Sequence, residues 1–203
     1  LDDLEAGAEE VLGKAEEEVS AVVGPVPIYE LKVSLRDIRP QIWRRLLVPG
    51  DSALDELHEV IQIAMGGTDS HLHSFYVDRA AFVPEELEDS PGYPEEEYRL
   101  MDLGLRQKQR FRYVYDFGDG WEHEILVSKI IPPEEVPAEE RTGPRLISGK
   151  RAAPPEDCGG VPGYYRLVYF IDEEEPESEE STFWREMIPS DWDPEAVDIE
   201  ARS

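Results

Sequence analysis

The chain has 203 residues, of which 40% are hydrophobic, so it is long enough for one domain with a core and a short extension. Its 47 acidic residues outnumber 20 basic ones, and the formal net charge of −27 makes duplex DNA an unfavourable partner. A single cysteine excludes an internal disulfide and a multi-cysteine zinc site. No apolar run reaches the roughly 18 residues of a membrane span, so we expect a cytoplasmic protein that stays out of the membrane.

The first 24 residues differ from the rest in composition. Residues 1–23 carry eight acidic residues and one lysine, and their apolar residues recur at helical spacing. Gly24, Pro25 and Pro27 then end the helical pattern. We expect an acidic helical extension at residues 1–24, followed by a single domain at residues 25–203.

The domain is predicted to be α+β, because locally connected strands dominate and helices gather at the C-terminus. Strands are predicted where apolar and polar residues alternate, at 28–36, 41–48, 71–78, 111–117 and 121–131. One helix is inserted after the second strand, with Ser52 and Asp55 as a capping box and Gly66 after its end. We expect a mostly antiparallel sheet of about five strands with this inserted helix and C-terminal helices. His58, on the apolar stripe of the helix, is predicted to be a core histidine bonded to a neighbour.

The hairpin at residues 111–131 is the most distinct element. Asp119-Gly120 is the dipeptide that a two-residue type I′ turn needs, because both central residues take positive φ. Such a turn places Asp116 opposite His123, so that a carboxylate faces an imidazole across the ladder.

Histidines on predicted strands form a candidate metal site. His71 and His73 are two residues apart and therefore share a face, and His123 lies on another strand. Together with Asp116 they offer imidazole and carboxylate ligands for zinc, manganese or iron. The same histidines suit a half-buried sheet, and their spacing matches no common zinc motif. We therefore expect no cofactor, with a divalent metal as the alternative.

Signatures of nucleophilic catalysis are missing from the sequence. There is no Gly-x-Ser-x-Gly elbow and no phosphate-binding glycine loop. Ser70, Ser74 and Cys158 are the nucleophiles left by elimination, and we interpret Cys158 as structural. This pattern favours a binding protein over an enzyme.

Five short strings, taken in order, resemble the plasmid pRiA4b ORF-3-like family. They are Ile42-Trp43-Arg44-Arg45, Leu54 to His58, Thr68 to Phe75, Tyr115 to His123 and Pro154 to Gly160. The resemblance covers roughly residues 28–171. It implies an α+β fold and an association with plasmids and other mobile elements, and it transfers no catalytic residue, cofactor or substrate to this chain.

We predict a non-catalytic binding or regulatory module whose partner is a small ligand or a basic protein. Its pocket is predicted to be lined by Trp43, Arg45, His71, His73, Asp116, Asp119, Trp121 and His123. One alternative is a metal-dependent hydrolase that uses the histidines with Asp116 or Asp119. Another is single-stranded nucleic-acid binding by residues 110–115, where arginines alternate with aromatic residues.

Overall fold

The computed structural model describes residues 26–87, 90–137 and 143–172, with short C-terminal pieces at 182–184, 186, 188, 192–197 and 199. The acidic helical extension predicted at residues 1–24 lies outside the described residues. Within the described part of the chain, no helix has the length and hydrophobicity that crossing a bilayer requires.

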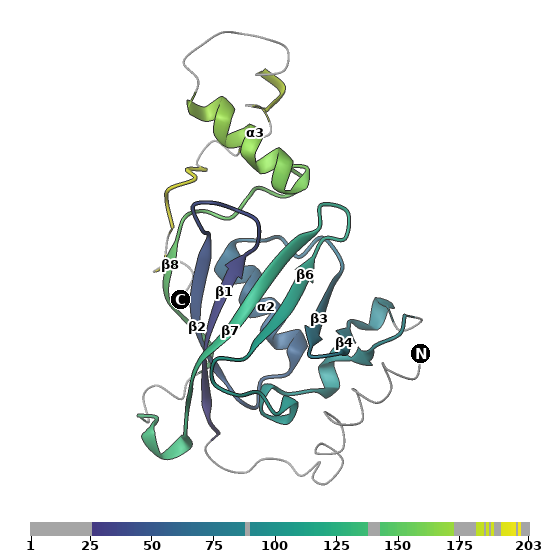
Figure 1. Ribbon diagram of the computed structural model, residues 1–203, viewed down its shortest axis with the longest axis vertical. Helices are drawn as coiled ribbons and strands as arrows, with labels where there is room; N and C mark the ends of the chain where they lie inside the picture. The colour runs from purple at the N-terminus through teal and green to yellow at the C-terminus, as the bar shows by residue number, and fades with distance from the viewer. Residues whose placement is uncertain are drawn as a thin grey trace.

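A single sheet of eight strands forms the body of the molecule (Figure 1). The strands are β1 (Ile28–Leu35), β2 (Trp43–Pro49), β3 (His73–Val77), β4 (Ala80–Val83), β5 (Tyr93–Pro94), β6 (Arg110–Tyr115), β7 (Trp121–Ile131) and β8 (Arg145–Lys150). Their order across the sheet is β5-β4-β3-β6-β7-β1-β2-β8. All neighbouring pairs are antiparallel except β4 and β5, which run parallel, so the sheet is mixed and the class is α+β.

The prediction of a mostly antiparallel sheet of about five strands is wrong, because β4, β5 and β8 were not anticipated and the parallel pairing of β4 with β5 makes the eight-stranded sheet mixed. Strands β4 and β5 have four and two residues and lie in a proline-containing stretch, too short to show alternation. In β8 buried and exposed residues do not alternate, so this strand also lacks the two-residue periodicity that predicts a strand.

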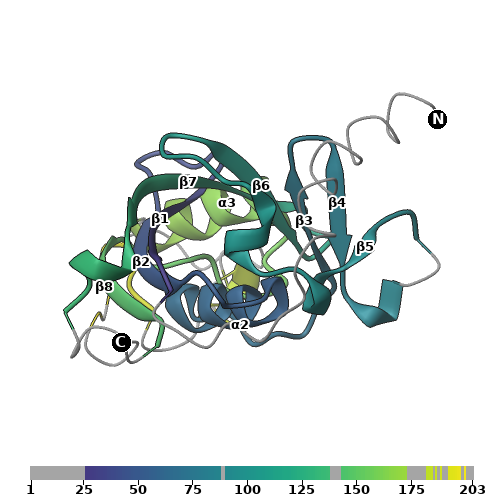
Figure 2. The ribbon, with the colours of Figure 1, turned by 90° about the horizontal axis from the view of Figure 1, so that it is seen from below.

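Helix α2 (Leu54–Met65) covers one face of the sheet, which curves around it (Figure 2). Its buried stripe includes Leu54, Leu57 and Ile61. The predicted capping box is wrong by one residue, because the N-cap is Ala53, whose N–H donates to Glu56 Oε2 over 3.2 Å. The predicted helix end is confirmed, with Gly66 in the left-handed region at φ +81°.

Arg44 joins the helix to the edge of the sheet. It is the largest fully buried side chain, and its Nε donates to the Ala64 carbonyl oxygen over 2.8 Å. Its Nη1 donates to the carbonyl oxygens of Trp43 and Lys150, at 2.9 and 3.2 Å. One guanidinium therefore holds the last turn of α2 against β2 and β8, where a cation also meets the negative end of the helix dipole.

Remaining short helices connect the strands or lead away from the sheet. They are the 3₁₀ helices η1 (Glu85–Leu87), η2 (Glu95–Glu97), η3 (Leu100–Leu103) and η4 (Pro133–Glu135). Helix α3 (Gly160–Asp172) lies at one end of the sheet, beyond the loop between β1 and β2 (Figure 1).

Replacing Arg44 with methionine is expected to lower the free energy of unfolding by roughly 3 kcal/mol, because buried carbonyl groups lose their donor. Arg45→Met is the matched control, because Arg45 projects from the other face of β2 and its ion pair with Glu30 is partly exposed. That variant should lose less than about 1 kcal/mol. Urea denaturation of both variants measures the difference, and equal losses would contradict the role given to Arg44.

Candidate functional site

Three segments that are distant in the sequence meet at one end of the sheet. They are Thr68–His71 after α2, the loop Asp116–Gly120 between β6 and β7, and the turn Glu156–Gly160 before α3. Together they contribute His71, Asp116, Glu156 and Asp157, which we call the carboxylate–histidine cluster.

The register of the hairpin differs from the prediction. Tyr113 is the residue opposite His123, and Tyr115 is opposite Trp121. Asp116 therefore lies in the loop instead of facing His123. The expected two-residue turn is wrong, because the connection runs from Asp116 to Gly120.

Asp116 organises this longer loop through its own side chain. Its Oδ1 accepts hydrogen bonds from the backbone N–H groups of Gly118 and Asp119, at 2.9 and 3.3 Å. Its carbonyl oxygen accepts from Gly120 N–H over 2.7 Å, and its own φ is +54°, a conformation that aspartate tolerates better than most residues. The buried carboxylate is thereby held at the base of the loop.

The hairpin loop and the Glu156–Gly160 turn are in close contact. Asp119 Oδ2 accepts from the Gly159 N–H over 3.0 Å. A Cβ at residue 160 would lie 2.5 Å from the Asp119 carbonyl oxygen, and Gly160 has a φ of +66°, so only glycine fits. Asp119, predicted as a pocket residue, positions the turn that carries Glu156 and Asp157.

His71 is surrounded by carboxylates. Its Nε2 lies 3.2 Å from Asp157 Oδ1 and 3.8 Å from Glu156 Oε2, and its Nδ1 lies 3.8 Å from Asp116 Oδ1. One ligand atom each from His71, Asp116 and Asp157 lie within 4.8 Å of one another. The Nε2 atom is buried and has no hydrogen-bond partner among the described residues. Asp116 is buried, whereas the Asp157 side chain is 74% exposed, so the cluster opens to solvent on one side.

Glu156 is held in place by the neighbouring segment. Its Oε1 accepts from Thr68 N–H over 2.9 Å and from the Tyr115 hydroxyl over 3.1 Å. Burial raises the pKa of Tyr115 to about 12, so this hydroxyl keeps the proton that it donates. The second carboxylate oxygen is the one that faces His71.

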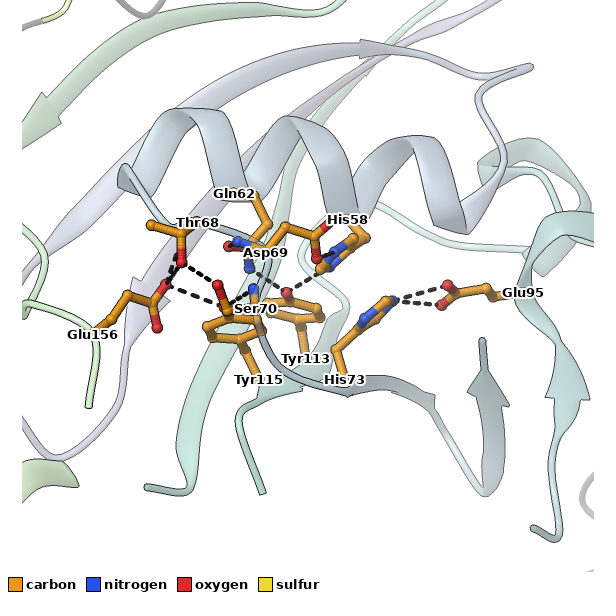
Figure 3. A network of polar contacts seen from close by, with 10 residues as sticks. All are labelled: His58, Gln62, Thr68, Asp69, Ser70, His73, Glu95, Tyr113, Tyr115 and Glu156. Carbon is orange, nitrogen blue, oxygen red and sulfur yellow. Dashed lines mark hydrogen bonds and ion pairs between the residues drawn. The ribbon is translucent and has the colours of Figure 1, made fainter. Parts of the chain in front are cut away.

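A partly buried polar network supports the cluster from the side of α2 (Figure 3). His58 Nε2 donates to Asp69 Oδ1 over 2.7 Å, and the Tyr113 hydroxyl, 2.8 Å from His58 Nδ1, donates to that nitrogen while it accepts from Gln62 Nε2 over 2.9 Å. Burial, and next the adjacent His73, lower the pKa of His58, which favours the neutral ring. The prediction that His58 is a bonded core histidine is confirmed, and its bond fixes the segment that leads to His71.

His73 and Glu95 form the other half of this network (Figure 3). The His73 ring stacks on His58 with centroids 3.5 Å apart and planes 2° apart. Its Nε2 lies 2.9 and 3.0 Å from the two oxygens of Glu95, and both side chains are buried. Sequence reasoning missed Glu95, because it lies among other glutamates in an irregular stretch and no periodicity distinguishes it.

The residues of the sequence-predicted pocket are dispersed. His71 and Asp116 come together in the carboxylate–histidine cluster, while His73 bonds Glu95. Trp121 and His123 line another cavity, of about 40 Å³, whose wall also includes Tyr115 and Glu156. His123 Nδ1 lies 3.2 Å from the Trp121 carbonyl oxygen, and burial lowers the pKa of His123 to about 4.

Two further members of that set lie on the sheet face that turns away from α2. Lys32 Nζ lies 5.1 Å from the centre of the Trp43 ring, and Arg45 lies 3.4 Å from Glu30. Because Arg44 contacts the helix, the alternation of β2 places its neighbours Trp43 and Arg45 on the opposite face.

Burial accounts for two other features singled out from the sequence, the candidate nucleophile Cys158 and the aromatic residues of β6. Cys158 is buried, and burial raises the pKa of its thiol to about 12, which fits a structural residue and not a nucleophile. In strand β6 the aromatic residues Phe111, Tyr113 and Tyr115 are buried, whereas Arg110 is exposed. The alternating arginines and aromatic rings therefore point to opposite faces and do not form one platform.

Comparison with known proteins shows that this chain has relatives similar in sequence and in structure. Residues 27–201 match the family described as plasmid pRiA4b ORF-3-like protein. The uncharacterized protein y4hQ of Sinorhizobium fredii is 40% identical over 139 residues, which cover 68% of this chain and 69% of that protein. The crystal structure of MM3350, a protein of unknown function from Methanosarcina mazei, superimposes with a TM-score of 0.77 at 34% identity, covering 88% of this chain and 98% of that chain.

The free energy of unfolding should fall as the pH drops below about 6.5, because unfolded His123 gains a proton that the buried ring, with its pKa of about 4, does not. The loss should be complete near pH 4 and amount to roughly 3 kcal/mol for this residue. Urea denaturation between pH 7 and pH 4 measures it. His123→Leu should show a flatter dependence, with His58 supplying part of the remaining slope. An unchanged slope in that variant would contradict this assignment.

Proposed function

This chain belongs to the plasmid pRiA4b ORF-3-like family, and we propose that it binds a divalent metal ion and acts as a metal-dependent hydrolase. The metal ligands in this proposal are His71, Asp116 and Asp157, with Glu156 beside them. The set shares His71 and Asp116 with the metal site proposed from the sequence, and it replaces the other two histidines with carboxylates.

The observation that carries the proposal is the buried Nε2 of His71. It faces Asp157 and Glu156 at 3.2 and 3.8 Å, yet it makes no hydrogen bond within the described structure. A buried ring nitrogen without a partner is unfavourable, and a metal ion would use its lone pair. A cation would also relieve the repulsion among neighbouring carboxylates. One imidazole with carboxylates suits manganese, iron or zinc.

Hydrolysis is the chemistry that this ligand set supports best. Three protein ligands leave coordination positions for water and substrate, as in catalytic metal sites. A divalent ion there would lower the pKa of bound water. Glu156 lies beside His71 and is fixed through its other oxygen by Thr68 and Tyr115, so it is positioned to accept a proton.

Alternatives draw less support from the described residues. In a metal-free binding module, the buried Nε2 of His71 would stay without a hydrogen bond. Single-stranded nucleic-acid binding needs exposed rings for stacking, and Phe111, Tyr113 and Tyr115 are buried. We further propose that the substrate is a small molecule and that the protein is located in the cytoplasm.

Isothermal titration of metal-stripped, full-length protein with Mn²⁺ and Zn²⁺ tests the proposal. We expect one ion per chain, and affinity should fall on the order of 100-fold or more in His71→Ala and in Asp157→Asn, because loss of even an outer-shell partner weakens metal sites 10–100-fold. Asp157 is largely exposed, so its variant should fold normally.

His123→Leu serves as the control, since His123 is not among the proposed ligands and its Nδ1 lies 3.2 Å from the Trp121 carbonyl oxygen. It should retain the affinity of the unmodified chain. Stoichiometric binding that survives His71→Ala, or that is lost in His123→Leu, would refute the ligand set, and no binding of either ion would refute the metal itself.

A further inference from the structure

A larger cavity adjoins the carboxylate–histidine cluster. Its volume is about 360 Å³, and His71 belongs to both the cavity wall and the cluster. The wall also includes Glu95, His73, Asp69 and Leu72. A molecule held in this cavity would therefore lie next to the proposed metal ion.

Two carboxylates, Asp69 and Glu95, line the cavity wall, and none of the described lining residues is lysine or arginine. Each carboxylate contacts a histidine of the same wall, Asp69 with His58 at 2.7 Å and Glu95 with His73 at 2.9 Å. His58, which also lines the cavity, has its pKa lowered by burial, so it adds no positive charge at neutral pH. The wall repels anionic ligands and attracts cationic ones, in line with the net charge of −27.

Glu95 is a preorganised acceptor in this wall. The residue is 3% exposed, and both of its oxygens are held by the single Nε2 of His73, whose ring is fixed by stacking on His58. A carboxylate has about four acceptor positions, so Glu95 keeps capacity for further donors from the cavity. Burial strengthens its attraction for a charged donor.

From this geometry we infer that the cavity binds the ammonium group of an aliphatic amine, and that the amine-bearing molecule is the substrate class of the adjacent metal site. The second part of this inference, that the amine is the substrate class of the metal site, rests on the proposed function. Leu72 is 39% exposed in the cavity wall and offers an apolar contact for the methylene groups of such a ligand. The ammonium donates to Glu95 and Asp69, which leaves the rest of the molecule near His71.

Three four-carbon probes test the charge preference: 1,4-diaminobutane, 1,4-butanediol and succinate. They differ in carrying positive, neutral or negative ends on the same chain length. In isothermal titration of full-length, Mn²⁺-loaded protein, only the diamine should bind. Succinate or butanediol binding as tightly as the diamine would overturn the inference, as would no binding of the diamine.

Variants locate the binding site of the diamine. Glu95→Gln and Asp69→Asn should each weaken its binding roughly tenfold or more, since each removes one charge-assisted hydrogen bond. Asp69 is 58% exposed, so its variant provides a reading even if the Glu95 variant is unstable. Glu59→Gln, an exposed acidic residue on α2 next to His58, is the control and should leave binding unchanged. Equal losses in all three variants would indicate a non-specific charge effect and overturn the inference.

The same titrations separate this inference from the proposed function. If Mn²⁺ binds but the diamine does not, the amine cavity is wrong and the metal site stands. If the diamine binds to metal-free protein that takes up no Mn²⁺, the cavity stands as an amine site while the hydrolase proposal fails.

Discussion

The close contact between Gly160 and the carbonyl oxygen of Asp119 determines where the candidate site forms. The backbone of the turn before α3 touches the hairpin loop so closely that a Cβ at residue 160 would lie 2.5 Å from that oxygen. Asp119 completes the contact by accepting a hydrogen bond from Gly159. Two segments 40 residues apart are thereby locked together, and the carboxylates of Asp116 and Asp157 converge on His71 as a consequence.

The remaining wall of the site depends on buried polar groups and not on apolar packing alone. His58 fixes Asp69 from α2, and His73 fixes Glu95, with the two imidazole rings stacked between the carboxylates. A network of this kind specifies one arrangement because its buried members, His58, His73 and Glu95, would lose their partners in another. Arg44 contributes at the last turn of the helix, where it connects α2 to β2 and β8. Rigid support on both sides suits a site that must hold ligand atoms at fixed positions.

Local patterns in the sequence were sufficient for the elements with clear periodicity and insufficient for the site. Alternation identified β1, β2, β3, β6 and β7, and the Gly66 end of α2 followed from its composition. Strand β5, with two residues, carries no periodic signal, and β8 lacks alternation. The hairpin was mispredicted because the Asp116 side chain caps a longer loop than the Asp-Gly dipeptide suggests. Of the predicted metal ligands, the structure joins His71 and Asp116. Asp157 and Glu95 could not be selected, because a chain with 47 acidic residues offers many equivalent carboxylates and only tertiary contacts distinguish them.

Pulsed electron paramagnetic resonance of the Mn²⁺-loaded, full-length protein tests the central claim most directly, because electron spin echo modulation reports nitrogen atoms bound to the ion. We predict the coupling of a single imidazole nitrogen, which disappears in His71→Ala and persists in His123→Leu. An echo without nitrogen modulation, or one whose modulation survives His71→Ala, would show that the ion is bound elsewhere and would contradict the proposed site.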